Sequence, residues 1–288
     1  MRGGRAPLKA ALKSCLFTNF ADENAQTMEL TFYKYQGTGN DFVMIDNRDL
    51  QFPHDDAPLI QHLCNRRFGI GADGLILLNP SENHDFKMVY FNADGGEGTM
   101  CGNGGRCLVA FAHDLKAIGD KTTFEAVDGL HHASIEEGIV SLQMIDVSEI
   151  QIESNHAFLD TGSPHHVELV ENIAAYDVFS NGKRIRNGAP YFQEGTNVNF
   201  VEATGTDSFR VRTYERGVEG ETLACGTGAT AVAIAMHAQN HTQANNIQLK
   251  VEGGTLEVSF HKNNHSYQNV FLKGPAKFVF QGQLSIKK

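Results

Sequence analysis

The sequence YFNADGGEGTMCGNGGRC occupies residues 90–107, and a related sequence, YERGVEGETLACGTG, occupies residues 214–228. A shift of 124 positions aligns Cys101 with Cys225 and matches the glycines that follow each cysteine. Self-similarity at one fixed offset is typical of a duplicated structural unit. The repeat therefore predicts two similar halves, each with a Cys-Gly-x-Gly element.

A helix-forming segment follows each of these elements. Residues 105–116 place Leu108, Phe111 and Leu115 at helical spacing, and residues 229–240 are mostly Ala, Val, Ile and Met without proline. A cysteine just before such a helix lies beside unpaired backbone N–H groups and the positive end of the helix dipole. Both features favour a thiolate over a thiol, so we expect each half to hold a base.

The composition bounds the class of protein. The chain has 288 residues, of which 41% are hydrophobic, which is enough for two ordinary cores. Lys and Arg number 24 against 34 Asp and Glu, so the net charge is −10, which argues against binding of a nucleic-acid backbone. No apolar run is long enough for a membrane span. A small-molecule partner is the better prediction.

Cysteine usage predicts a cytoplasmic protein with reduced thiols. The five cysteines are an odd number, and no secretory leader is visible. The spacings Cys-x-x-Cys and His-Glu-x-x-His do not occur, so we expect no metal site. Neither a glycine-rich dinucleotide motif nor a lysine in a phosphate-binding context is present, so we expect no cofactor. We predict that Cys64 and Cys107 are packed core thiols.

Residues 1–27 are basic and amphipathic at first and then polar. We predict that they are disordered, either as an extension before a true start at Met28 or as a transit segment of the mitochondrial type. A chain that begins at Met28 is expected to keep full activity.

Glycine-rich loops recur at the same places in both halves. Residues 37–41 join two strand-like runs, and an offset of 123 pairs Asn40 with Ser163. Glycine lets the backbone approach a ligand closely, although an ordinary hairpin turn explains the first loop as well. The offset of 124 also pairs Asp73 with Asn197.

Two thiols in matched positions suggest the inversion of a carbon centre. If the halves pack with pseudo-twofold symmetry, one cysteine as thiolate removes a proton from one face, and the other as thiol donates a proton to the opposite face. The backbone N–H groups of Gly102, Asn103, Gly226 and Thr227 are suited to hold a carboxylate beside the reacting carbon.

The glycine-rich loop at 37–42, the segment 92–104 and the segment 215–228 resemble those of the diaminopimelate epimerases. The resemblance runs from about Thr31 to Ala276. It implies interconversion of LL- and meso-diaminopimelate in lysine and peptidoglycan precursor biosynthesis, without a cofactor and as a homodimer.

The resemblance also implies roles for individual residues. Cys101 and Cys225 correspond to the acid/base pair, with His165 and Glu215 as further catalytic candidates. Substrate binding is implied for Asn40, Asn92, Gly102, Asn103, Ser163, Asn197, Glu215, Arg216, Gly226 and Thr227. Many relatives have asparagine where this chain has Ser163. Glu215 either binds the distal ammonium group or supports its loop, and His165 either orients a reacting group or is structural.

We predict an α+β fold with two pseudo-symmetric domains, each a curved, mostly antiparallel sheet around a central helix. The first domain is expected to comprise residues 28–146 with 277–288, and the second residues 147–276. Two alternatives stay open from the residues. One is a proline or hydroxyproline racemase-type enzyme, whose first thiol motif usually has histidine where this chain has Asn103. The other is a non-catalytic amino-acid-binding protein, which has no need of paired thiols.

Overall fold

The computed structural model describes residues 27–287. By compactness the described chain divides into a body, Thr31–Gly282, and a small unit made of residues 27–30 and 283–287. The body contains the paired cysteines and all the α-helices of the described residues. The prediction of disorder for residues 1–27 falls, except for Thr27, outside the part of the chain that the structure describes.

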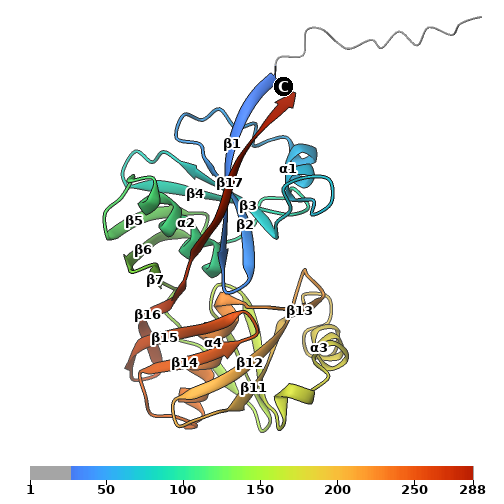
Figure 1. Cartoon of the computed structure of the whole chain (residues 1–288). Helices are drawn as coiled ribbons and strands as arrows, with labels where there is room; N and C mark the ends of the chain where they lie inside the picture. Colours follow the sequence, from blue (N-terminus) through green and yellow to red (C-terminus); the bar gives the residue numbers. More distant parts are fainter. Residues whose placement is uncertain (1–26, 288) are drawn as a thin grey trace, which may run out of the picture. The chain divides into compact units, whose positions relative to one another are not determined.

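The first half of the fold consists of eight strands and two helices (Figure 1). Its strands are β1 (Thr27–Gly37), β2 (Asn40–Asp46), β3 (Gly74–Asn79), β4 (Phe86–Asn92), β5 (Lys121–Ala126), β6 (Gly129–Glu136), β7 (Ile139–Gln143) and β17 (Lys277–Lys287). Its helices are α1 (Ala57–Cys64) and α2 (Gly102–Asp114).

The second half is built in the same way from the intervening chain. Its strands are β8 (Ile150–Ile152), β9 (His156–Asp160), β10 (Pro164–Leu169), β11 (Asn197–Ala203), β12 (Ser208–Glu215), β13 (Gly220–Thr222), β14 (Asn246–Val251), β15 (Gly254–Asn263) and β16 (Ser266–Pro275). Its helices are α3 (Val178–Asn187) and α4 (Gly226–Ala238), with a 3-10 turn at Ile173–Ala175.

Strand pairing repeats between the halves. In the first half β2–β3 and β4–β5 are parallel, whereas β3–β4, β5–β6 and β6–β7 are antiparallel. In the second half β10–β11 and β12–β14 are parallel, whereas β11–β12, β14–β15 and β15–β16 are antiparallel. The predicted α+β fold of two pseudo-symmetric, mostly antiparallel halves is confirmed.

Helices α2 and α4 form the centres of the two halves. Each has 13 residues, and in each the residue before the helix is the cysteine of the repeat. Residues Ala229–His237 of α4 are buried without interruption, as the apolar sequence predicts. Both helices begin three residues earlier than expected, because the glycines lie within the first turn, where each cysteine side chain caps the helix.

Helix α1 has eight residues and ends at Cys64. Asn65 has an extended conformation (φ −69°, ψ 122°), and its side-chain oxygen accepts hydrogen bonds from the backbone nitrogens of Arg67 and Phe68, each at 2.9 Å. An asparagine side chain that accepts hydrogen bonds from the backbone of the next few residues stabilises a turn instead of a helix. Helix α1 therefore ends before Asn65. Cys64 and Cys107 are buried, as predicted.

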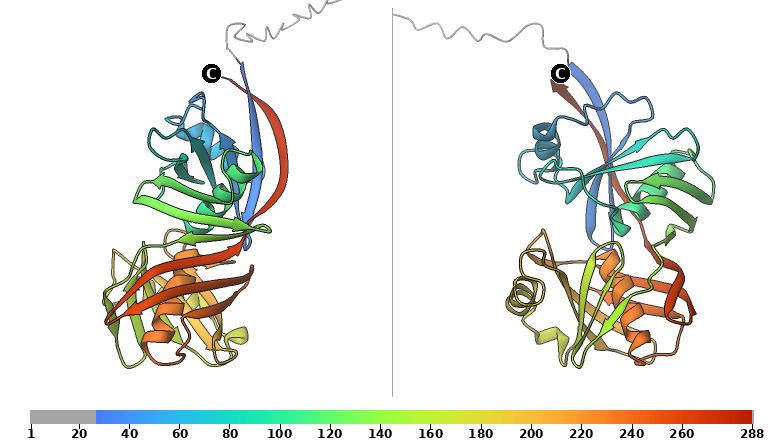
Figure 2. Two further views of the ribbon diagram at one scale, coloured as in Figure 1. Left: turned by 90° about the vertical axis from the view of Figure 1, so that its left-hand side faces the viewer. Right: turned by 180° about the vertical axis from the view of Figure 1, so that it is seen from behind.

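Two strand contacts determine how the chain passes between the halves. Strand β16 pairs antiparallel with β7, so that Gly274 lies opposite Val140. Strand β17 then runs along β1 (Figure 2), where the ring of Phe280 contacts Phe32 and that of Phe278 contacts Tyr35. The chain thus returns to the first half at its end. The exact domain boundaries, residues 28–146 with 277–288 and 147–276, stay a proposal.

Candidate active site

Each central helix begins immediately after a cysteine that caps it. Cys101 and Cys225 have extended backbones, and their sulfurs accept hydrogen bonds from the backbone nitrogens of Gly104, at 3.5 Å, and Gly228, at 3.4 Å. A cap of this kind satisfies one of the N–H groups that the first turn of a helix leaves unpaired. The two thiols therefore occupy equivalent positions in the two halves.

The first turns of α2 and α4 contact each other through glycines. A β-carbon on Gly226 would lie 3.2 Å from the Cα of Gly102 and 3.3 Å from the backbone nitrogen of Asn103. The side chain of Asn103 also crosses this junction and donates to the carbonyl oxygen of Ala224 at 3.0 Å. The N-terminal N–H groups of the two helices, together with their capping thiols, thus gather at one junction between the halves.

Burial dominates the protonation of both thiols. It raises the pKa of Cys101, although hydrogen bonds from the backbone N–H groups of α2 act in the opposite direction. Burial raises the pKa of Cys225 as well, and the charge of Glu215 raises the pKa of both thiols further. The sequence-based expectation that the helix ends favour the thiolate is wrong for this arrangement, because loss of hydration outweighs the hydrogen bonds from the helix ends.

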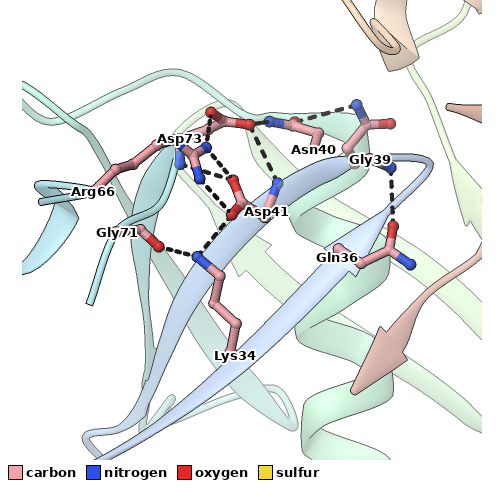
Figure 3. Close-up of polar contacts among 9 residues, drawn as sticks. Lys34, Gln36, Gly39, Asn40, Asp41, Arg66, Gly71 and Asp73 are labelled. Atoms are coloured by element: carbon pink, nitrogen blue, oxygen red, sulfur yellow. Dashed lines mark hydrogen bonds and ion pairs between the residues drawn. The ribbon is translucent and has the colours of Figure 1, made fainter. Parts of the chain in front are cut away.

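Asn40 joins the first thiol to the loop between β1 and β2. The Cys101 thiol donates to the Asn40 side-chain oxygen at 3.8 Å, and Asn103 donates to the same oxygen at 3.2 Å. The Asn40 side-chain nitrogen donates to Asp73 at 2.6 Å (Figure 3). Because both ends of the amide are engaged, its oxygen is directed toward the thiol.

A charged network holds this loop in place (Figure 3). The guanidinium of Arg66 binds Asp41 at 2.6 Å and Asp73 at 2.7 Å, and the ammonium of Lys34 lies 2.8 Å from Asp41 and also donates to the carbonyl oxygen of Gly71. Burial alone would raise the pKa of Asp41, but the hydrogen bonds from Arg66 and Lys34 lower it to about 2. Asp41 therefore stays ionised and keeps both cations beside the loop.

Asn197 is the counterpart of Asp73 in the second half, as Ser163 is of Asn40. Its side-chain nitrogen donates to the hydroxyl of Ser163 at 2.6 Å, and its side-chain oxygen accepts from the backbone nitrogen of Arg216 at 2.9 Å. The Arg216 guanidinium donates to the carbonyl oxygen of Glu194 at 3.0 Å, and no carboxylate among residues 27–287 forms an ion pair with it. The structure thus brings Ser163, Asn197 and Arg216 together and leaves the guanidinium charge uncompensated.

His165 is a buried, neutral histidine. Burial, with a smaller effect of the Arg216 charge, lowers its pKa to about 3. Asn199 accepts from the Thr213 hydroxyl and donates to the His166 carbonyl oxygen, which leaves its amide nitrogen to face His165 Nδ1 at 3.1 Å. His165 Nδ1 is therefore an acceptor, and Nε2 carries the proton. Among the described residues Nε2 has no hydrogen-bond partner.

Glu215 is a half-buried carboxylate at the end of β12. It accepts a hydrogen bond from the Thr222 hydroxyl at 2.9 Å, and burial raises its pKa, with that hydrogen bond acting in the opposite direction. Its negative charge raises the pKa of both Cys101 and Cys225.

The remaining predicted residues are less tightly connected. Asn92 lies at the end of β4 with an exposed side chain, which forms no hydrogen bond with other described residues. Thr227 contacts the Cys225 sulfur through its hydroxyl at 3.4 Å. Asp73, Thr222 and Asn199 were not predicted as site residues, although the offset of 124 pairs Asp73 with the predicted residue Asn197.

Three further observations concern the described residues as a whole. Within residues 27–287 no group of three or more His, Cys, Asp or Glu side chains is arranged to hold a metal ion. The four described cysteines, Cys64, Cys101, Cys107 and Cys225, are free. No helix in the described part of the chain is both long enough and apolar enough to cross a membrane.

Comparison with known proteins identifies similar chains. Residues 32–142 and 157–279 match the family model described as diaminopimelate epimerase. A diaminopimelate epimerase from Flavobacterium psychrophilum is 60% identical over 253 residues, which cover 88% of this chain and 99% of that protein. A diaminopimelate epimerase from Chlorobaculum tepidum is 44% identical over 261 residues, which cover 87% and 99% respectively.

Solved structures with the same fold are more distant in sequence. A phenazine biosynthesis protein from Bacillus anthracis has a TM-score of 0.71 at 14% identity and covers 90% of this chain and 100% of its own. A hydroxyproline epimerase from Agrobacterium vitis has a TM-score of 0.64 at 13% identity, with 90% and 93% covered. At these identities the likeness concerns the fold alone.

Proposed function

The chain belongs to the diaminopimelate epimerase family, and on this premise we propose that it interconverts LL- and meso-2,6-diaminopimelate without a cofactor. The observation that carries the proposal is the contact of α2 with α4 at Gly102 and Gly226, because each helix begins at a capping thiol. A substrate carbon bound at this junction meets one sulfur on each face. The activity serves lysine and peptidoglycan precursor biosynthesis.

The reaction is a proton transfer in two directions. The thiolate of one cysteine takes the α-proton, and the electron pair of the broken C–H bond passes onto the α-carbon and its carboxylate. The other cysteine, as a thiol, donates its proton to the opposite face and forms the new C–H bond. The two sulfurs end with their protonation states exchanged, so Cys101 and Cys225 exchange roles for the reverse reaction.

Developing negative charge is stabilised by the helix ends. The backbone N–H groups of Gly102, Asn103, Gly226 and Thr227 have no partners within their helices and are suited to bind the carboxylate beside the reacting carbon. The raised pKa of both thiols supports the role of the cysteines as bases, because a thiolate formed in a buried site is a stronger base than one in water.

His165 and Glu215 assist this proton balance. The Nε2 proton of neutral His165 lacks a partner among the described residues and is free to donate to a reacting group. The carboxylate of Glu215 raises the pKa of both cysteines, so its ionisation strengthens whichever thiolate acts as the base.

The polar residues around the junction bind the ends of the substrate. The uncompensated guanidinium of Arg216 suits the distal carboxylate, which a planar fork binds through two parallel hydrogen bonds. The amides of Asn40, Asn92 and Asn197, with the Ser163 hydroxyl, donate to carboxylates and accept from ammonium groups.

We further propose that the enzyme is a cytoplasmic homodimer. Three consecutive residues of β17, Phe278, Val279 and Phe280, are exposed to between 44% and 51%, and exposed apolar runs of this kind favour association. The free thiols of the described residues suit a reducing compartment. Sedimentation of the full chain at several concentrations tests the dimer.

One assay tests the reaction itself. The full chain is incubated in deuterated water with LL-diaminopimelate or with L-proline, and deuterium at the α-carbon and the stereochemistry are followed. We expect deuterium incorporation and the meso isomer from diaminopimelate only. Exchange with proline supports a racemase instead, and binding of diaminopimelate without exchange identifies a binding protein.

A further inference from the structure

Arg106, in the second turn of α2, is a fully buried cation without a carboxylate partner in the described part of the chain. Its relative exposure is 0%, and its guanidinium donates to Asn103 Oδ1 at 3.0 Å, the Gly102 carbonyl oxygen at 3.4 Å and the Thr38 hydroxyl at 3.5 Å. Its Nε has no hydrogen-bond partner among residues 27–287. Since a buried charge without a counter-charge is unfavourable for stability, the residue needs a functional explanation.

Two glycines, one in each half, leave room for this guanidinium. A β-carbon on Gly37 of β1 would lie 3.3 Å from Arg106 Nη2, and one on Gly274 of β16 would lie 3.4 Å from Arg106 Nε. The cation therefore lies between strands of the two halves, directly behind the first turn of α2. The site of the guanidinium is therefore formed jointly by α2, β1 and β16.

The guanidinium fixes the orientation of the Asn103 amide. Because arginine only donates hydrogen bonds, Asn103 must turn its oxygen toward Arg106. Its nitrogen then faces the side-chain oxygen of Asn40, at 3.2 Å, and the carbonyl oxygen of Ala224, at 3.0 Å. A reversed amide would place its nitrogen against the guanidinium and its oxygen against two other oxygens.

This amide ties the surroundings of one thiol to those of the other. Asn40 is the residue that accepts from the Cys101 thiol, and Ala224 immediately precedes Cys225. Both contacts depend on the same Asn103 nitrogen. A change in its orientation is therefore expected to displace both thiols relative to a bound substrate.

The second half has no equivalent cation at this position. The offset of 124 pairs Arg106 with Thr230, whose hydroxyl donates to the Gly226 carbonyl oxygen at 3.0 Å. The charge of Arg106 lowers the pKa of Cys101, against the larger effects of burial and of the Glu215 charge, and Glu215 is also the main charge that acts on Cys225. The arginine thus places a cation behind the first helix that has no counterpart behind the second.

We propose that Arg106 is a positioning residue for the epimerase reaction: through Asn103 it holds the two cysteine loops in register, and its charge favours the form in which Cys101 carries the thiolate. This inference rests on the proposed function and deepens it. It gives a side chain of the first half a role that its counterpart in the second half, Thr230, does not share.

Three variants test the proposal. Arg106→Met removes the charge and the donors at similar length, and Arg106→Lys keeps the charge but loses the planar fork. The control, Arg210→Met, removes a half-exposed arginine that pairs with Glu252 at 2.8 Å. For each, kcat and KM with diaminopimelate are measured across pH. The rates at which iodoacetamide labels Cys101 and Cys225 are followed separately across pH by mass spectrometry.

For Arg106→Met we expect a fall in kcat on the order of 100-fold, the size typical of displaced reacting groups. The midpoints of Cys101 labelling and of the acid limb of kcat/KM should move to higher pH, with the midpoint for Cys225 unchanged. Arg106→Lys should restore the Cys101 midpoint without full recovery of kcat. Arg210→Met should match the unaltered chain.

The proposal is overturned if Arg106→Met keeps the Cys101 midpoint, or if the lysine and methionine variants shift it equally. Should Arg106→Met fail to fold, labelling of the unaltered chain at limiting iodoacetamide decides instead: preference for Cys101 supports the proposal, and equal or reversed labelling contradicts it. Labelling needs no turnover, so failure of the Arg106 proposal can be told apart from failure of the proposed function. The proposed function fails if the unaltered chain incorporates no deuterium at the α-carbon.

Discussion

The Cys101 thiol donates a hydrogen bond to the side-chain oxygen of Asn40 at 3.8 Å. The acceptor faces a thiol, not a thiolate, so this arrangement stabilises the protonated form of Cys101. Once the proton leaves, the two groups repel each other, and the Asn40 oxygen retains only its bond from Asn103 at 3.2 Å. The loop at Asn40 is therefore coupled to the protonation state of the sulfur.

Replacing either cysteine of the pair by serine should nearly abolish epimerisation. A serine hydroxyl is a far weaker acid than a thiol, so it neither forms the base nor donates the proton readily, and loss of such a group typically costs about 100- to 10,000-fold in rate. We expect losses in this range for Cys101→Ser and for Cys225→Ser, measured as deuterium incorporation at the α-carbon. Cys64→Ala, which alters a core thiol, is the matched control, and normal turnover by either serine variant would remove that cysteine from the mechanism.

The rate should rise with pH in the alkaline range. Burial raises the pKa of both thiols above the ordinary value, so little thiolate is present in the free enzyme near neutrality. Since the base must be a thiolate, kcat/KM should increase as pH rises through about 7 to 9, the range around the ordinary thiol pKa. A value of kcat/KM that stays level or falls over this range would show that the base is already ionised at neutral pH.

Asp73→Ala should reduce activity much more than stability. The substitution removes the acceptor that holds the Asn40 amide at 2.6 Å and the second carboxylate of the Arg66 network. Because ion pairs on exposed side chains contribute only about 0–1 kcal/mol, the melting temperature should change little. We expect kcat/KM to fall on the order of 10- to 100-fold, as the amide no longer faces the thiol.

The control for Asp73→Ala is Asp46→Ala, which breaks an ion pair with Arg48 at the other end of β2. Steady-state kinetics and thermal unfolding of both variants are compared. Equal losses of kcat/KM in the two variants, or a loss that follows the melting temperature, would show that the network acts on folding alone.

Gly226→Ala should separate the two helix ends. The added methyl group would lie 3.2 Å from Gly102 Cα and 3.0 Å from the Leu272 side chain, so the contact between α2 and α4 must open by a few tenths of an ångström. Overpacking costs about 1–3 kcal/mol, offset in part by about 1 kcal/mol from the higher helix propensity of alanine. We expect a small change in the free energy of unfolding and a loss of kcat on the order of 100-fold.

Gly119→Ala is the matched control for Gly226→Ala, because nothing lies within 4 Å of the added carbon. Both variants are followed by urea unfolding and by the epimerase assay. Full activity in Gly226→Ala would mean that the spacing of the helix ends does not limit the reaction.

The repeat predicted the fold well because its signals are local. A cysteine followed by glycines and an apolar helix occurs twice, and both helices lie where the sequence indicates, with starts three residues earlier than expected. The shift arises because glycine has a low intrinsic helix propensity, whereas the cysteine caps and the packing of α2 on α4 stabilise the first turn.

Other parts of the site depend on contacts that the sequence does not display. Asp73 reaches Asn40 because β2 and β3 lie side by side as parallel strands, with Phe42 opposite Gly74, and nothing near Asn40 in the chain indicates this neighbour. The thiol pKa values were predicted in the wrong direction because a helix end is visible in the sequence, whereas the extent of burial follows from how the halves pack.

The return of β17 to β1 has a consequence for protein synthesis. The rings of Phe32 and Tyr35 find their partners Phe280 and Phe278 only when the last strand has left the ribosome. The half that is translated first is consequently completed last, after the intervening half already has all its strands. Premature termination before Lys277 leaves a nascent chain in which Phe32 and Tyr35 lack their ring contacts with β17. We expect chaperones and proteases to bind such a product, because its apolar surface stays exposed.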